Sequence, residues 1–136
     1  DETYQHATCS ERHSMLQGID ALITDMPGYC ICISTADCIP ILLYDKQHRV
    51  VAAVHAGWRG TVNRILAKTL HRMQAAYGTE GKDIIACIGQ LSDFGVPPRQ
   101  IENAGICTYE QHEDFFSARR LGIKSGRILS GIMINQ

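Results

Sequence analysis

The sequence VVAAVHAGWRGTVNRIL, residues 50–66, decides the fold class. Its first part, residues 50–56, is apolar except for His55, which is typical of a buried strand. A Gly-Trp-Arg-Gly segment follows, and from there apolar side chains recur every three to four residues, which is the period of a helix. A buried strand that leads into an amphipathic helix predicts a layered domain of α and β structure.

The rest of the chain extends this pattern on both sides. The helix is expected over residues 60–77, and Gly78 is expected to end it. Its apolar stripe comprises Val62, Ile65, Leu66, Leu70, Met73 and Tyr77. Further strands are expected at residues 20–25, 29–35, 39–45, 83–89, 101–108 and 127–134. Strands this apolar are typically covered on both faces. We therefore predict a mixed α+β sandwich of the α/β class, a single domain over residues 1–136 with a mixed sheet and packed helices.

The composition excludes several classes of protein. Of 136 residues, 45% are hydrophobic and 20% charged, and the net charge is -1, so there is no basic surface for nucleic acid. No apolar run approaches the ~20 residues that span a membrane. Residues 1–13 are polar and do not resemble a secretory signal. Most of the six cysteines lie in apolar, strand-like surroundings and no secretory signal is visible, which favours free thiols in a reducing compartment over disulfides. No Cys-x-x-Cys pair occurs, which argues against a zinc ribbon. We predict a cytoplasmic protein that binds neither nucleic acid nor membranes.

Cys38 and His55 are the first candidates for chemistry. Cys38 lies at a break between two apolar runs, and adjacent strands would bring it and His55 to one end of a sheet, where ligand sites are common. A cysteine sulfur with a histidine nitrogen suits Zn or Cu. The same pair suits a cysteine nucleophile with a histidine base. A third interpretation is that both side chains are structural and buried, which is commoner for a single cysteine or histidine.

Arg59 is the candidate for binding an anion. It precedes the expected start of the helix at Gly60 and Thr61, where free backbone N–H groups and the helix dipole favour negative charge. A guanidinium group adds paired donors suited to phosphate. The alternative is that Arg59 pairs with a carboxylate and Trp58 packs under the helix.

Two further arginines, Arg119 and Arg120, follow paired aromatic residues in the sequence FFSARR, residues 115–120. They are candidates for contacting a polar ligand. The alternative is that they form ordinary solvated surface, where most arginines lie.

Four segments together resemble a known family. These are TADCIPILLYD (35–45), VAAVHAGWRGTVNRIL (51–66), CTYEQHEDFFSARR (107–120) and GRILSGIMI (126–134). They resemble the YfiH-type family, whose members are called multicopper polyphenol oxidases (laccase-like) and also purine nucleoside phosphorylases. The resemblance covers nearly the whole chain, and the Thr-Ala-Asp-Cys and His-Ala-Gly-Trp-Arg-Gly pair is highly specific.

The resemblance implies a mixed α/β fold with a catalytic metal site. Cys38 and His55 would be two of three protein ligands to Zn or, in the oxidase description, to Cu. Asp37 would orient a ligand or support the metal site, and Arg59 with the helix start would hold phosphate. Family members are described as splitting adenosine, inosine and methylthioadenosine with phosphate, and as deaminating adenosine. The implied partners are therefore a purine nucleoside and phosphate, bound by a monomer or homodimer.

Three alternatives to this function remain open at this stage. One is a copper-dependent, laccase-like polyphenol oxidase, for which six scattered histidines are few. The second is a Cys–His hydrolase without metal, and the third is a domain with no enzymatic activity. Metal content and the alkylation rate of Cys38 separate them.

The sequence departs from the family pattern in three places. The family's third ligand is a His in a Gln-x-His-Gly motif that is absent here, since His6 is not followed by Gly. Gln90 runs directly into Leu91 where relatives carry several dozen further residues. Glu110 stands where many relatives have another Cys. From the first two departures we expect a single catalytic domain that lacks an N-terminal part and an internal segment near 90/91.

Overall fold

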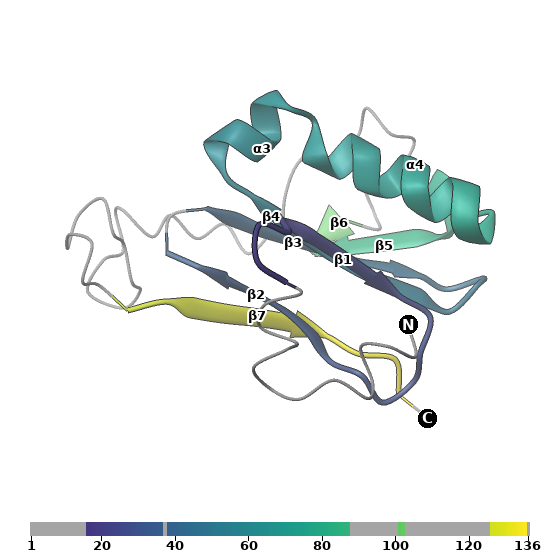
Figure 1. Ribbon diagram of the computed structural model, residues 1–136. Coiled ribbons are helices and arrows are strands. Elements are labelled where there is room, and N and C mark those ends of the chain that lie inside the picture. The colour runs from purple at the N-terminus through teal and green to yellow at the C-terminus, as the bar shows by residue number, and fades with distance from the viewer. Residues whose placement is uncertain (1–15, 37, 88–100, 103–125, 136) are drawn as a thin grey trace.

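The fold consists of three layers, shown in Figure 1. The computed structural model describes residues 16–36, 38–87, 101–102 and 126–135. Two helices lie over one face of a five-stranded sheet, and a two-stranded sheet lies under the other face (Figure 1). This is the mixed α+β sandwich expected from the sequence.

The larger sheet is antiparallel except at one edge. Its strand order is β1 (Ala21–Thr24), β4 (Val50–Ala56), β3 (Ile39–Asp45), β5 (Ile84–Cys87) and β6 (Ile101–Glu102). Only β5 and β6 run parallel. The smaller sheet pairs β2 (Ile31–Thr35) with β7 (Ile128–Ile132) in antiparallel orientation. A short 3-10 turn, η1 (Gly81–Asp83), leads into β5.

Strand β4 lies at the centre of the core. Its residues from Val50 to Val54 are completely buried, because α4 (Ile65–Tyr77) covers one face and β2 lies against the other. Leu70 and Met73 of α4 pack into this cluster. The expected covering of both faces is thus confirmed for β4. It is wrong for β2, where Ser34 is exposed because this strand belongs to the outer layer.

The single helix expected over residues 60–77 is two helices. The first, α3 (Trp58–Val62), begins two residues earlier than expected, and α4 follows it. Arg64 between them has φ 54° and ψ 46°, a left-handed conformation that interrupts the helical hydrogen bonds. The break removes Val62 from the apolar stripe, and its side chain is 74% exposed. Gly78 ends α4 in the left-handed conformation, as expected.

The turn between β3 and β4 is built around a buried carboxylate. Asp45 is fully buried and accepts hydrogen bonds from the amides of Gln47 (2.9 Å) and His48 (3.0 Å) and from His48 Nδ1 (2.8 Å). Burial acts to raise the pKa of Asp45, but the polar groups around it, the Thr79 hydroxyl and His48 first among them, outweigh burial and hold the pKa below its ordinary value. The turn fixes the β3–β4 register, which runs from Asp45↔Val50 to Ile39↔Ala56.

The strands of the structure agree in position with those predicted from the sequence. Strands occur at all the positions predicted from the sequence, although of the strand expected at residues 101–108 the structure describes only Ile101–Glu102. In the described part of the chain, no helix is long and apolar enough to cross a membrane. The predictions for His6 and Glu110 fall outside the described residues.

Candidate metal centre

Cys38 and His55 lie together at the open end of the β3–β4 hairpin. Cys38 immediately precedes β3, and the register places His55 opposite Pro40. Gly57 shows how close the two side chains are. A methyl carbon added to Gly57 would lie 3.2 Å from Cys38 Sγ and 3.9 Å from His55 Nε2. The sulfur and the ring nitrogen therefore face the same small volume, which the absent side chain of Gly57 leaves open.

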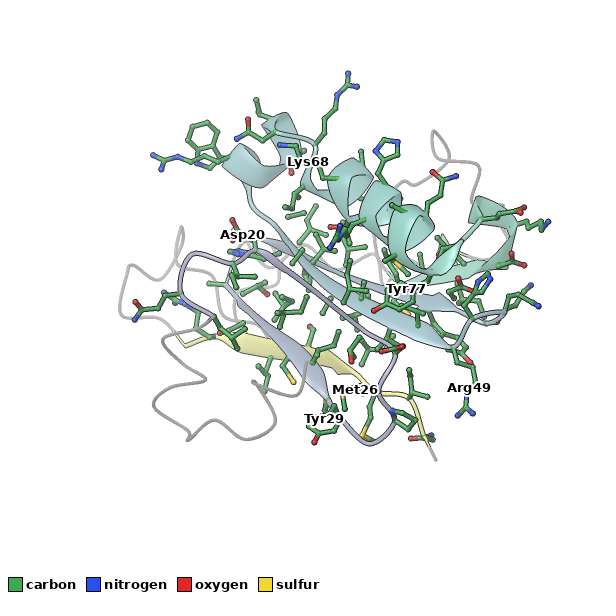
Figure 2. All side chains as sticks on the ribbon, turned by 45° about the vertical axis from the view of Figure 1, so that its right-hand side comes forward. Asp20, Met26, Tyr29, Arg49, Lys68 and Tyr77 are labelled. Carbon is green, nitrogen blue, oxygen red and sulfur yellow. The ribbon has the colours of Figure 1, made fainter. Side chains whose placement is uncertain are left out.

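Asp20 fixes the orientation of the His55 ring. Its carboxylate Oδ1 lies 3.1 Å from His55 Nδ1, and its carbonyl oxygen accepts the His55 amide at 2.7 Å. The β1–β4 register pairs Ala21 with Val54, so Asp20 and His55 are the next cross-strand pair and point to the same side. Figure 2 shows Asp20 at the end of the sheet beneath α3, with Arg49 at the opposite end.

This contact decides which ring nitrogen can bind a ligand. An ionised carboxylate can only accept, so a hydrogen bond between these two groups requires the proton on Nδ1 of His55. In that neutral tautomer Nε2 keeps its lone pair, and Nε2 is the ring nitrogen that lies beside the open space at Gly57, as Cys38 Sγ does. Histidine ligands of metals are held in this way by carboxylates. Asp20 is not among the site residues predicted from the sequence. Its only sequence signal is an acidic residue directly before an apolar strand.

The donor set fits a thiophilic metal. A thiolate and a neutral imidazole are ligands that Zn and Cu accept. The His55 side chain is 33% exposed, so a ligand can reach it. Within the described ranges, no group of three or more His, Cys, Asp or Glu side chains could hold a metal ion.

Arg59 and Trp58 form the exposed beginning of α3. The Arg59 guanidinium carbon lies 5.3 Å from the centroid of the Trp58 ring, in the range of a cation–π contact. Trp58 is 74% exposed. The alternative in which Trp58 packs under the helix is therefore wrong, because this side chain points to solvent.

Gly60 and Thr61 occupy structural positions in α3. A methyl carbon on Gly60 would lie 3.2 Å from Ile65 Cγ2 and 3.4 Å from the His55 carbonyl oxygen, so glycine permits the close approach of α3 to β4. The Thr61 amide (2.8 Å) and hydroxyl (2.9 Å) both donate to the Gly57 carbonyl. Because α3 begins at Trp58, the Thr61 amide belongs to the helical hydrogen bonds and is not a free donor for an anion. The other site candidates, Asp37, Arg119 and Arg120, lie outside the described residues.

A sequence model of a known family matches almost the whole chain. The family is described as multi-copper polyphenol oxidoreductase laccase, and the matched residues are 2–91 and 90–135. This chain belongs to that laccase family. The laccase-family assignment agrees with the resemblance inferred from the sequence motifs.

Curated relatives and solved structures support the assignment. A purine nucleoside phosphorylase of Bacteroides thetaiotaomicron is 46% identical over 183 aligned positions, covering 99% of this chain and 68% of the relative. Adenosine deaminase RL5, from an unknown prokaryotic organism, is 34% identical, and the alignment covers 97% of this chain and 68% of the relative. The crystal structure of YlmD from Geobacillus stearothermophilus has a TM-score of 0.81 and 25% identity, over 88% of this chain and 62% of that one. The crystal structure of Bacillus licheniformis YfiH has a TM-score of 0.79 and 26% identity, over 85% of this chain and 61% of that one.

The laccase-family match has a discontinuity. Its two matched blocks meet at residues 90–91. The alignment to the Bacteroides relative has 183 positions although this chain has 136 residues, so the relative carries residues that have no counterpart here. The chain spans about three fifths of the solved laccase-family structures. The absence of an internal segment near 90/91 stays a prediction.

Proposed function

We propose that this chain carries the metal site of a purine nucleoside phosphorylase that also deaminates adenosine. One observation is central to the proposal. Cys38 Sγ and His55 Nε2 both lie within 4 Å of the space beside Gly57, and the Asp20 carboxylate lies 3.1 Å from the other nitrogen of the ring. The names of the two relatives, a purine nucleoside phosphorylase and an adenosine deaminase, supply the substrate class.

Cys38 and His55 would hold a zinc ion, with a third ligand from outside the described residues. When bound, zinc acts as a Lewis acid that polarises a substrate oxygen or nitrogen. The chain's own contribution is to present a sulfur and an oriented imidazole at a partly exposed strand end. Asp20 keeps His55 in the tautomer that can bind, and Asp37, directly before Cys38, is proposed to orient the substrate.

Phosphate binding is assigned to Arg59 and the start of α3. In phosphorolysis a phosphate oxygen bonds to the sugar carbon while the bond from that carbon to the base nitrogen breaks, and the base leaves with the electron pair. Arg59 is four residues after His55, and its guanidinium can donate paired hydrogen bonds to phosphate. Gly60 contributes by letting α3 approach the His55 carbonyl. Thr61 contributes through the hydrogen bonds that fix the first turn of α3, and Arg119 and Arg120 are proposed as further anion contacts.

The test is base release from adenosine, inosine and methylthioadenosine with and without phosphate, together with zinc content. Cys38→Ala is expected to lose zinc and all phosphate-dependent release. Cys87→Ala is the matched control, because Cys87 is also half-buried in the large sheet but lies outside the site. Phosphorolysis that survives in Cys38→Ala would contradict the proposal.

A copper-dependent polyphenol oxidase is the second candidate, favoured by the family description and by a Cys–His pair that also suits Cu. It is distinguished by oxygen uptake with a phenolic substrate. If uptake rises in proportion to bound copper and nucleosides are not cleaved, the oxidase assignment replaces the phosphorylase assignment.

A further inference from the structure

Two cysteines outside the metal centre lie in contact with each other. Cys30 and Cys32 flank Ile31 at the beginning of β2, and their sulfur atoms are 3.5 Å apart. Cys30 is exposed and Cys32 is half-buried, so the pair can be reached from solvent. Neither residue has a role in the proposed phosphorylase.

The two thiols lie on the outer face of the small sheet. Side chains alternate along a strand, and Ile33 and Thr35 of β2 are buried against the large sheet, so Cys32 and Ser34 point outward. Tyr29, the residue before Cys30, lies on the side of the molecule away from the helices (Figure 2). The pair is thus on a different face from Cys38 and His55.

A glycine on the neighbouring strand makes room for both sulfurs. Gly131 of β7 is the register partner of Cys32. A methyl carbon added to Gly131 would lie 2.9 Å from Cys32 Sγ and 3.0 Å from Cys30 Sγ, closer than carbon and sulfur can approach. Both thiols therefore rest against the bare backbone of Gly131, which holds them side by side.

The geometry favours an ion between the sulfurs over a disulfide. A disulfide needs Cβ atoms about 3.5–4.5 Å apart. Residues two apart on an extended strand have Cα atoms about 6.6 Å apart and parallel Cβ directions, so a direct bond would require the backbone to move. Two thiolates on one tetrahedral ion, with metal–sulfur bonds of about 2.3 Å, have sulfurs about 3.8 Å apart. The observed 3.5 Å is close to this spacing.

A third sulfur, that of Met133, belongs to the residue that directly follows β7. The β2–β7 ladder ends at the pair Ile31↔Ile132, immediately before Met133. Met133 is 45% exposed. Thiolates and thioethers together favour soft cations over hard ones.

We propose that Cys30 and Cys32 form a second metal site, a dithiolate that binds a soft, thiophilic cation. The divalent ion replaces two thiol protons, which are released to solvent, and no electron is transferred. Burial, and then the neighbouring Cys30 thiol, raise the pKa of Cys32.

The experiment measures protection of each cysteine from alkylation. The full chain, kept reduced, is treated with iodoacetamide with and without Cd²⁺, and each cysteine is quantified by peptide mass spectrometry. Cd²⁺ is expected to slow alkylation of Cys30 and Cys32 together by at least tenfold. Cys30→Ser is expected to remove the protection of Cys32, since a single thiolate cannot chelate.

Two further variants separate a chelate from simple burial. Gly131→Ala keeps both thiols, but the added methyl group displaces the two sulfur atoms. It is expected to reduce the protection of both cysteines from alkylation several-fold. Ser34→Ala, on the same face, is the control and is expected to keep it. If Cd²⁺ protects neither cysteine, or if Cys32 stays protected in Cys30→Ser, the proposal is wrong. A Cd²⁺ titration by charge-transfer absorbance gives an independent answer, with one equivalent fewer expected in the Cys30→Ser/Cys32→Ser variant.

Discussion

Replacing Asp20 with alanine tests the central feature of the proposed metal centre, the carboxylate beside Nδ1 of His55. The change removes the acceptor 3.1 Å from Nδ1 but keeps the main-chain bond from the His55 amide to the carbonyl of residue 20, so the β1–β4 register should persist. Without the carboxylate, the ring proton can move to Nε2 and the ring can rotate. We therefore expect weaker zinc binding without loss of the fold.

The size of the effect follows from the exposure of the pair. Loss of a carboxylate that supports a histidine ligand costs 10–100-fold in metal affinity, as an order of magnitude. The Asp20 side chain is 56% exposed, so water can partly replace it and the lower end applies. The expected loss is about tenfold, or about 1.4 kcal/mol. The free energy of unfolding of the metal-free protein should fall by less than about 1 kcal/mol, because exposed ion pairs contribute little.

The assay is zinc affinity by competition with a chelating dye, together with nitrogen NMR shifts of His55. Asp25→Ala is the matched control, because Asp25 is an exposed aspartate at the other end of β1. Equal zinc affinity for Asp20→Ala and the unchanged protein would refute this reasoning. So would a His55 ring that carries its proton on Nε2 while Asp20 is present.

Three further predictions follow from the packing and the turn. Gly57→Ala is expected to reduce zinc affinity at least tenfold, because the added methyl lies 3.2 Å from Cys38 Sγ. Little change in Tm is expected, because the φ of -74° at this position suits alanine. Chelator competition and a melting curve check this, and unchanged zinc affinity would contradict it. Asp45→Asn is expected to lower the free energy of unfolding by about 1–3 kcal/mol in urea titrations at pH 7. Because the folded pKa of Asp45 is depressed, its contribution is present above the unfolded value of about 4 and is lost as pH falls through the folded pKa, so the two proteins should converge in acid. Met73→Ala is expected to cost about 2–5 kcal/mol and Val62→Ala less than about 0.5 kcal/mol, and comparable losses would indicate one unbroken helix.

The sequence by itself determined the local elements of this protein. Apolar runs placed the strands, and the apolar period of residues 65–77 with Gly78 placed α4, because these patterns depend on contacts between residues two to four positions apart. The sequence also carried the family assignment, through the segments around Cys38 and His55. Proximity of these two residues followed from an ordinary hairpin of adjacent strands.

The break at Arg64 could not be predicted from the pattern. The apolar stripe is continuous in the sequence, and Val62 fits it as well as Leu70 does. In the folded chain a methyl carbon on Gly60 would lie 3.2 Å from Ile65 Cγ2 and 3.4 Å from the His55 carbonyl oxygen, and Arg64 adopts the left-handed conformation between α3 and α4. The apolar pattern of the sequence contains neither of these features.

Tertiary structure alone decided what surrounds the reactive side chains. Asp20 meets His55 across 35 residues because β1 pairs with β4 in one register, and a slip of one residue would turn the two side chains to opposite faces. The sulfur atoms of Cys30 and Cys32 both lie against Gly131 because β2 pairs with β7. Strand pairing over such separations is set by how whole layers bury their apolar faces, and this information is spread over the chain rather than held in any one motif.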